Sequence, residues 1–528
     1  MSAALLDTPR TARRRWALEL LGVALLGALQ ALSFAPHPLW WLQIACTAGF
    51  AWRVQAARRP ARAALLGLVF GTAWLCASVW WLFISMHFYG GLAAWMAALA
   101  VLALCAFLSL YLATAMAAFA KWRFGSPLPD AVFFGAMWLA AELARGVLFT
   151  GFPWAASGYA HVDGPLAALA PWVGVYGIGA VAAMVAALVA ALAARRSRAS
   201  RIACAVAGGV LLLAPQALPQ DLTQPSGTLS VTLLQGNVAQ EEKFASAYQP
   251  QALAWYADAL AESPGDLVVA PETAVPLLPE QLPDGFWDAL SERFAHGDRA
   301  GLLGLPLGSF EMGYTNSVAG LSAASIATGR GYYRYDKHHL VPFGEFIPPG
   351  FHWFTEMMSI PLGDFARGPL NAPSFQVRGE RIGPNICYED LFGEELAARF
   401  VEPSRAPTIF ANVSNIAWFG DSVAISQHLQ ISRMRSLELQ RPMIRATNTG
   451  ATALIDHRGQ VTQSLAPITR GILQGQVQGR TGRTPFAVWA SDLGLWPLWV
   501  LVLAALVAAI RESHRRSWVR PEAPPDAI

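Results

Sequence analysis

The run ALAPWVGVYGIGAVAAMVAALVAALA, at residues 168–193, decides half of the fold. It contains 26 residues and no charged side chain. About 20 mostly apolar residues are enough for a helix to cross the roughly 30 Å of hydrocarbon in a bilayer. The run therefore predicts a transmembrane helix.

Similar apolar runs near both ends of the chain predict eight membrane spans. Their approximate bounds are 16–34, 39–55, 63–85, 92–120, 131–150, 168–193, 202–218 and 486–510. Glu142 and Arg145 lie three residues apart on one face of the fifth span, where they could form an ion pair. These spans divide the chain into transmembrane helices 1–7 (1–218), an extramembrane domain (219–485), an eighth transmembrane helix (486–510) and a tail (511–528).

Composition and charge support this division. The chain is 54% hydrophobic and only 14% charged, which excludes a wholly soluble enzyme of ordinary composition. Residues 219–485 have a net charge of −7, and the rest of the chain has +10. Eighteen of the 19 basic residues outside 219–485 lie in five clusters, at 10–15, 53–62, 121–123, 195–201 and 511–520.

These clusters follow every second span. The positive-inside rule therefore predicts a multi-pass protein with both termini in the cytoplasm and residues 219–485 on the opposite, periplasmic face. Because topology explains the clusters, we expect no nucleic-acid partner. Trp40, Trp41, Trp80 and Trp81 lie near span ends and are interpreted as interfacial belt residues.

The extramembrane domain has short apolar runs separated by helical patterns. Strands are predicted at 229–235, 267–270, 301–305, 317–321, 332–335, 381–386, 408–411 and 451–455. Helices are predicted at 251–261, 285–295, 393–400 and 426–440. This alternation predicts a layered α/β domain with a largely buried sheet.

Three residues follow the ends of predicted strands and suggest a site: Glu272, Lys337 and Cys387. Ligand sites in α/β proteins gather at the carboxyl ends of strands. There a thiolate could act as nucleophile, a carboxylate as proton acceptor and an ammonium as oxyanion stabiliser. Taken singly, each has an ordinary alternative, namely a packed thiol, a solvated lysine or a helix-capping glutamate.

Three motifs resolve these alternatives together. They are Pro271-Glu-Thr, Tyr335-Asp-Lys-His-His-Leu-Val-Pro-Phe-Gly-Glu-Phe-Ile-Pro and Ile386-Cys-Tyr-Glu. With the eight predicted spans, they closely resemble the apolipoprotein N-acyltransferase family. This family is a membrane-bound branch of the nitrilase (carbon–nitrogen hydrolase) superfamily, found in the inner membrane of Gram-negative bacteria. The resemblance implies an α-β-β-α sandwich for residues 219–485.

The resemblance also implies residue roles. Glu272 would be the general base, Lys337 the oxyanion stabiliser and Cys387 the nucleophile. Glu345 matches a second glutamate of the family, although it could also simply cap backbone N–H groups. Tyr388 and Glu389 match positions beside the nucleophile, where the Tyr388 N–H would contribute to an oxyanion hole or the side chains would order the turn.

Two further segments match the family less fully. Asn415 and Trp418 lie in Ser414-Asn-Ile-Ala-Trp-Phe-Gly, where Ile416 replaces the family's usual Asp. Phe244 stands where some members carry Trp, which keeps an aromatic wall but loses the indole donor. The apolar loop at 351–358 is expected either to dip into the bilayer surface or to pack in the core.

The implied reaction is a ping-pong acyl transfer with a thioester on the cysteine. The donor would be a phospholipid, with phosphatidylethanolamine expected, and the acceptor the N-terminal diacylglyceryl-cysteine of an apolipoprotein. No metal or other cofactor is expected, His338 and His339 are interpreted as structural, and a monomer in the bilayer is the default state. Two alternatives remain: a membrane-tethered nitrilase or amidase, and a transporter or sensor whose extramembrane domain only binds ligand.

Overall fold

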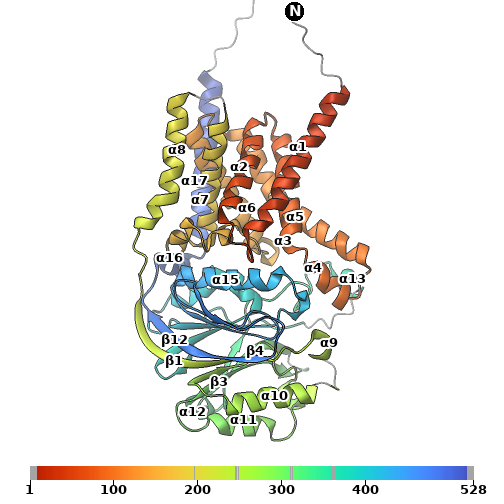
Figure 1. Ribbon diagram of the computed structural model, residues 1–528, viewed down its shortest axis with the longest axis vertical. Coiled ribbons are helices and arrows are strands. Elements are labelled where there is room, and N and C mark those ends of the chain that lie inside the picture. The colour runs from red at the N-terminus through yellow and green to blue at the C-terminus, as the bar shows by residue number, and fades with distance from the viewer. Residues whose placement is uncertain are drawn as a thin grey trace, which may run out of the picture.

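The computed structural model describes residues 9–194, 197–243, 247, 249–309, 311, 313–357 and 364–519. A helical domain and a domain of β-sheets are stacked along the long axis of the molecule (Figure 1). The helical domain contains α1 (Pro9–Gln30), α2 (Trp40–Ala56), α3 (Pro60–Val79), α4 (Leu82–Ile84), α5 (Ala94–Trp122), α6 (Pro127–Val147), α7 (Ala170–Ala193), α8 (Arg198–Leu213) and α17 (Trp496–Val519). The first described turn of α1 and the last of α17 lie at the same end of the bundle (Figure 1).

Among the described residues, seven helices are long and apolar enough to cross a membrane, one fewer than the eight predicted spans. The span predicted at 39–55 is α2, which has 17 residues. At a rise of 1.5 Å per residue it is about 25 Å long, and about 17 residues is the lower end of the range for a membrane-spanning helix. We therefore keep α2 as the second and shortest span of the predicted topology.

The last predicted span, 486–510, differs more. Residues Pro485–Leu493 form a separate short helix, α16, and α17 begins only at Trp496. Gly494 separates them with φ 55°, a left-handed conformation that glycine adopts at little cost. α17 then packs on α6 and α5.

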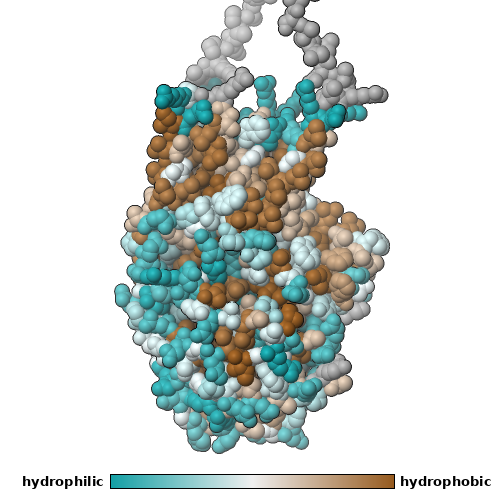
Figure 2. Space-filling model, viewed as in Figure 1, coloured by the Kyte–Doolittle hydropathy of each residue, from teal (hydrophilic) through white to brown (hydrophobic). Residues whose placement is uncertain are grey.

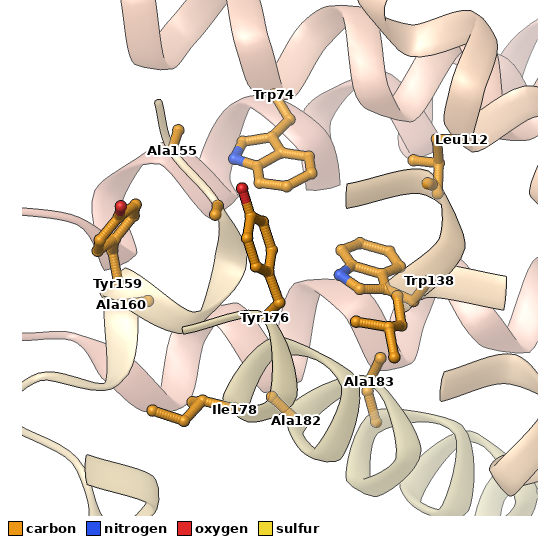
Figure 3. Close-up of a cluster of buried hydrophobic side chains, with 14 of the residues drawn as sticks. Trp74, Leu112, Trp138, Ala155, Tyr159, Ala160, Tyr176, Ile178, Ala182 and Ala183 are labelled. Atoms are coloured by element: carbon orange, nitrogen blue, oxygen red, sulfur yellow. The ribbon is translucent and has the colours of Figure 1, made fainter. Parts of the chain in front are cut away.

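Aromatic side chains fill the interior of the helical domain. Trp74 and Trp138 stack with ring centroids 5.8 Å apart, and Tyr176 of α7 points toward Trp74 (Figure 3). Glu142 and Arg145 are buried in the same region, with Nη2 and Oε1 3.9 Å apart, as their spacing predicted. On the face seen in Figure 2, apolar residues cover most of the helical bundle, whereas the sandwich end is largely hydrophilic.

The second domain, called here the sandwich domain, consists of two six-stranded sheets. Their strand orders are β12-β1-β2-β3-β4-β5 and β11-β10-β9-β8-β7-β6. The strands are β1 (Gln224–Gln235), β2 (Leu267–Val269), β3 (Ala300–Ser309), β4 (Gly313–Leu321), β5 (Tyr333–Asp336), β6 (Phe375–Val377), β7 (Glu380–Ile386), β8 (Ile409–Ser414), β9 (Met443–Thr447), β10 (Ala453–Ile455), β11 (Val461–Ser464) and β12 (Gly471–Thr481).

Apolar side chains of both sheets meet in one buried cluster, which includes Val231, Leu302, Ile386 and Ile444. Helices cover the outer faces: α10 (Gln249–Glu262) and α11 (Phe286–Phe294) on the first sheet, α14 (Gly393–Ala397) and α15 (Val423–Leu439) on the second. The predicted α-β-β-α sandwich is therefore confirmed.

Helix α15 lies between the sheets and the helical bundle (Figure 1). Its Gln427 accepts hydrogen bonds at Oε1 from Trp81 Nε1, at 3.2 Å, and from Trp154 Nε1, at 2.8 Å. Trp81 is 1% exposed, so its interpretation as an interfacial belt residue was wrong. Its indole instead joins the two domains.

Candidate active site

The three predicted site residues follow strands of both sheets. Glu272 comes three residues after β2, Lys337 directly follows β5, and Cys387 directly follows β7. β2 and β5 belong to the first sheet and β7 to the second. The candidate site therefore lies between the two layers of the sandwich, at the ends of these strands.

A compact cluster of charges forms around Lys337. Its Nζ lies 2.9 Å from Glu345 Oε1 and 3.6 Å from Glu272 Oε1. All three side chains are buried. Burial alone would lower the pKa of Lys337, but the two carboxylates outweigh it and raise the pKa above its ordinary value. Lys337 is therefore a permanent cation in the site.

Asn316 of β4 joins the two carboxylates and was missed in the sequence. Its Nδ2 donates to Glu272 Oε1 at 2.7 Å and to Glu345 Oε1 at 2.6 Å. Its backbone carbonyl accepts from the Lys337 N–H at 2.8 Å. One asparagine thus orients all three charged residues.

Glu345 also accepts a hydrogen bond from a backbone N–H group, as its alternative interpretation predicted. Its Oε2 accepts from the Val341 N–H at 2.8 Å while Oε1 binds the lysine. The carboxylate therefore has both roles at once. It fixes the loop after Lys337 and compensates the buried ammonium.

Cys387 begins a short helical turn, Cys387–Leu391, with φ 51°. A left-handed conformation is uncommon for a side chain of this kind and has to be held by its surroundings. Burial raises the pKa of the Cys387 thiol, Glu272 raises it further, and Lys337 opposes the increase only in part. The resting sulfur is therefore a protonated thiol that needs a base.

Glu389 holds this turn against the Lys337 loop. Its carboxylate accepts from Tyr335 Oη at 2.8 Å, from the Ile386 N–H at 2.6 Å and from the His338 N–H at 2.7 Å. Burial raises the pKa of Glu389. The neighbouring Tyr388 donates from Oη to the Gly151 carbonyl of the helical domain, at 3.0 Å.

The remaining predicted residues lie at different distances from the cluster. The Asn415 N–H donates to Glu272 Oε2 at 2.8 Å, so its backbone contacts the candidate base. The Trp418 ring instead packs edge-on against Tyr89 of the helical domain, with centroids 5.8 Å apart. Ile416 is 1% exposed and belongs to the apolar core, and Phe244 lies outside the described residues.

A second buried lysine was also missed. Lys243 Nζ donates to the Glu272 backbone carbonyl at 3.1 Å, and burial lowers the pKa of Lys243 to about 8. A sequence signal existed, because the chain contains only three lysines and two of them, Lys243 and Lys337, lie in the extramembrane domain. In a chain that otherwise uses arginine, both are unusual.

The two histidines after Lys337 contact protein atoms. His338 Nδ1 lies 2.8 Å from the Gly368 carbonyl, and His339 Nδ1 lies 2.9 Å from Glu395 Oε1. Nearby, Phe354 of the described part of this loop, 351–357, packs with Leu92 of the helical domain, whereas Trp353 is 61% exposed. The loop thus both packs and presents an apolar surface.

Comparisons with known proteins agree with both domains. The model described as apolipoprotein N-acyltransferase N-terminal domain matches residues 26–188, and the carbon-nitrogen hydrolase model matches 230–486. Apolipoprotein N-acyltransferase of Verminephrobacter eiseniae is 54% identical over 495 residues, which cover 89% of this chain and 92% of that protein. The corresponding protein of Ralstonia nicotianae is 48% identical over 502 residues, covering 94% of each, and that of Nitrosomonas europaea is 38% identical over 500, covering 93% and 97%.

Proposed function

The chain belongs to the apolipoprotein N-acyltransferase family, and on that premise we propose that Glu272, Lys337 and Cys387 transfer an acyl chain from a phospholipid to the α-amino group of an apolipoprotein's diacylglyceryl-cysteine. The observation that carries this assignment is the buried cluster in which Lys337 bridges Glu272 and Glu345 beside the thiol of Cys387. The donor is expected to be phosphatidylethanolamine.

In the first half-reaction Glu272 takes the thiol proton. The sulfur of Cys387 then attacks the ester carbonyl, a carbon–sulfur bond forms, and the ester carbon–oxygen bond breaks. Glu272 returns the proton to the departing glycerol oxygen, so a lysophospholipid leaves. Because burial raises the pKa of the Cys387 thiol, the nucleophile is generated only next to its base.

The tetrahedral intermediate carries a negative oxygen that requires donors. Lys337, held charged by two carboxylates, supplies one, and the Tyr388 backbone N–H is expected to supply another. Glu345 and Asn316 keep the ammonium and the base at fixed positions. Burial of these side chains strengthens the electrostatic stabilisation.

In the second half-reaction the α-amino group attacks the thioester. Glu272 takes a proton from the amine, the carbon–sulfur bond breaks, and the proton passes to the sulfur of Cys387. The amide of the triacylated lipoprotein and the free thiol result. Water in place of the amine would give a hydrolase, and the family membership favours the acyltransferase.

The protein is a multi-pass protein of the inner membrane, in keeping with its apolar helices and its Gram-negative relatives. We place both termini in the cytoplasm and the sandwich domain in the periplasm. The alternating basic clusters support this orientation, as does the common end of the bundle at which α1 begins and α17 ends (Figure 1). The domain divisions 1–218 and 219–485, with the last span formed by α17 from Trp496 rather than by 486–510, belong to the same proposal, as does the monomeric state.

The test uses the purified full chain with phosphatidylethanolamine alone. A hydroxylamine-sensitive acyl mass on the Cys387 peptide, absent in Cys387→Ala, is the expected result. A protein that forms no adduct but hydrolyses small amides would be a hydrolase. Normal lipoprotein N-acylation by Cys387→Ala would exclude the cysteine as nucleophile.

A further inference from the structure

A buried polar network lies directly behind the nucleophile. The Cys387 carbonyl is approached by His428 Nε2, at 3.2 Å, and by Asn412 Nδ2, at 3.4 Å. His428 is 1% exposed and Asn412 is fully buried. Neither residue is needed for the chemistry proposed above, so these two contacts require a separate explanation.

The neighbours of His428 determine which ring nitrogen carries the proton. Arg445 Nη2 lies 2.7 Å from His428 Nδ1 and is always a donor, so Nδ1 accepts. The neutral ring then carries its hydrogen on Nε2, which donates to the Cys387 carbonyl. Burial and the charge of Arg445 lower the pKa of His428 well below its ordinary value, with Lys337 acting in the same direction.

Arg445 is itself fixed from several sides. Its Nη1 lies 3.2 Å from Asp390 Oδ2, 3.2 Å from Asn412 Oδ1 and 2.5 Å from Ser432 Oγ. The Asp390 carboxylate also lies 3.9 Å from His428 Nε2. The imidazole is thus held in one tautomer and one orientation.

The backbone conformation of Cys387 indicates what these contacts stabilise. With φ 51°, the residue occupies a left-handed conformation that is strained for a non-glycine residue unless surrounding contacts hold it. Two donors on its carbonyl fix the peptide plane on the C-terminal side of the cysteine. The same plane carries the Tyr388 N–H, so the donors also set the direction of an expected oxyanion contact.

The residue before His428 faces the other domain. Gln427 accepts from Trp81 and Trp154 at Oε1, and its Nε2 donates to the Ser78 carbonyl at 3.1 Å. The Trp154 ring also packs on the His428 ring, with centroids 5.6 Å apart. Two consecutive residues of α15 therefore connect the helical domain to the carbonyl of the nucleophile.

We propose that His428 is a positioning residue, which holds Cys387 in its reactive conformation through the cysteine carbonyl, and that Gln427 makes this geometry depend on docking of the helical domain. The inference rests on the proposed function only for its consequence in acyl transfer. Geometry of the thiol itself can be measured without a lipid. The helical domain then has a role beyond anchoring, because it stabilises the active conformation of a residue in the other domain.

The test compares His428→Leu, His428→Gln and Gln427→Met in the full chain. Two rates are measured below the Tm of each variant: alkylation of Cys387 by iodoacetamide, followed on its peptide, and acylation by phosphatidylethanolamine. His428→Leu is expected to slow both by about tenfold or more with an unchanged KM for the lipid, since misplacement by about 1 Å can cost about a hundredfold. The Gln side chain can donate in place of Nε2 and should restore most of both rates.

Gln427→Met, which keeps the chain length but removes all three interdomain hydrogen bonds, should slow alkylation several-fold. His161→Gln is the matched control, because His161 is also fully buried but contacts Gln43 in the helical domain.

A wild-type alkylation rate in folded His428→Leu would overturn the inference, as would a His428→Gln variant that reacts no faster than His428→Leu. If His428→Leu does not fold, the alkylation rate of Gln427→Met becomes the deciding measurement. A wild-type rate in that variant would exclude the link between the domains. Alkylation without any acyl adduct in the wild type would refute the proposed function and leave the positioning role to be judged by alkylation alone.

Discussion

The ammonium of Lys243 donates to the backbone carbonyl of Glu272, with Nζ and O 3.1 Å apart. The candidate base is thus held by a second cation that does not contact its carboxylate. Lys243 is 5% exposed, and its pKa is lowered to about 8 by burial. Of the two lysines at the site, Lys243 therefore loses its proton at the lower pH.

This pKa predicts a pH dependence of stability. Unfolding returns the pKa of Lys243 to about 10.4, so between pH of about 8 and 10.4 the unfolded chain binds the extra proton. Stability of the wild type should therefore rise with pH across this window relative to Lys243→Met, which lacks the group. Thermal unfolding in detergent over this range measures the difference in Tm. Lys121→Met, at an exposed lysine, is the control, and a difference in Tm that does not change with pH would contradict the assignment.

Removing the shared amide should disable the site while leaving the fold intact. In Asn316→Leu, Glu272 and Glu345 lose a common donor and the distance between base and ammonium is no longer fixed. We expect turnover to fall by about tenfold to a hundredfold, because the reacting groups are misplaced. Acyl-transfer rates measure this effect. The exposed Asn371→Leu is the control, and full activity of Asn316→Leu would show that the amide is dispensable.

Replacing the sulfur tests the identity of the nucleophile. Cys387→Ser should lose activity by about a thousandfold or more, since an alkoxide is much harder to form than a thiolate. Its Tm should stay near that of the wild type because the side chains are almost the same size. Lipoprotein N-acylation is the readout, with Cys46→Ser in α2 as the control. Comparable activity of the two serine variants would remove Cys387 from the mechanism.

The buried pair in the helical domain should contribute to stability. Arg145 donates from Nη1 to the Phe152 and Trp154 carbonyls, at 3.1 and 2.6 Å, and pairs with Glu142. Arg145→Met leaves a buried carboxylate without its partner, which typically costs about 3–5 kcal/mol. The double variant Glu142→Gln/Arg145→Met should be less destabilised than the single one. A Tm of Arg145→Met equal to that of the wild type would contradict this prediction.

The sequence predicted the two-domain architecture because both of its signals are local. A long uncharged run can be recognised without knowing which segments it packs against. The same holds for residues that follow the ends of strands. Asn316 was missed because the strand was predicted to begin at 317, whereas β4 begins at Gly313 and includes Asn316. The pairing of β4 with β5 brings its amide to the loop that carries Glu345, and the order β2-β3-β4 brings it to Glu272.

Other differences have the same origin. β9 was not predicted because it contains Arg445, and a charged residue interrupts the apolar pattern of a buried strand. In the structure Asp390 and Ser432 contact this fully buried arginine. Trp81 looked like an interfacial residue because its acceptor, Gln427, is 346 positions away. The environments of Arg445 and Trp81 are set by contacts between segments that are distant in the sequence, and not by local propensity.

The helix that completes the bundle is also the last described segment of the chain to leave the ribosome. α17 packs on α6, and Arg516 donates to the Phe124 and Arg123 carbonyls at the loop between α5 and α6. The 282 residues between α8 and α17, with the whole sandwich domain among them, are synthesised first. Assembly therefore has an order: the α6 face that α17 covers can be completed only after the whole sandwich domain has been synthesised.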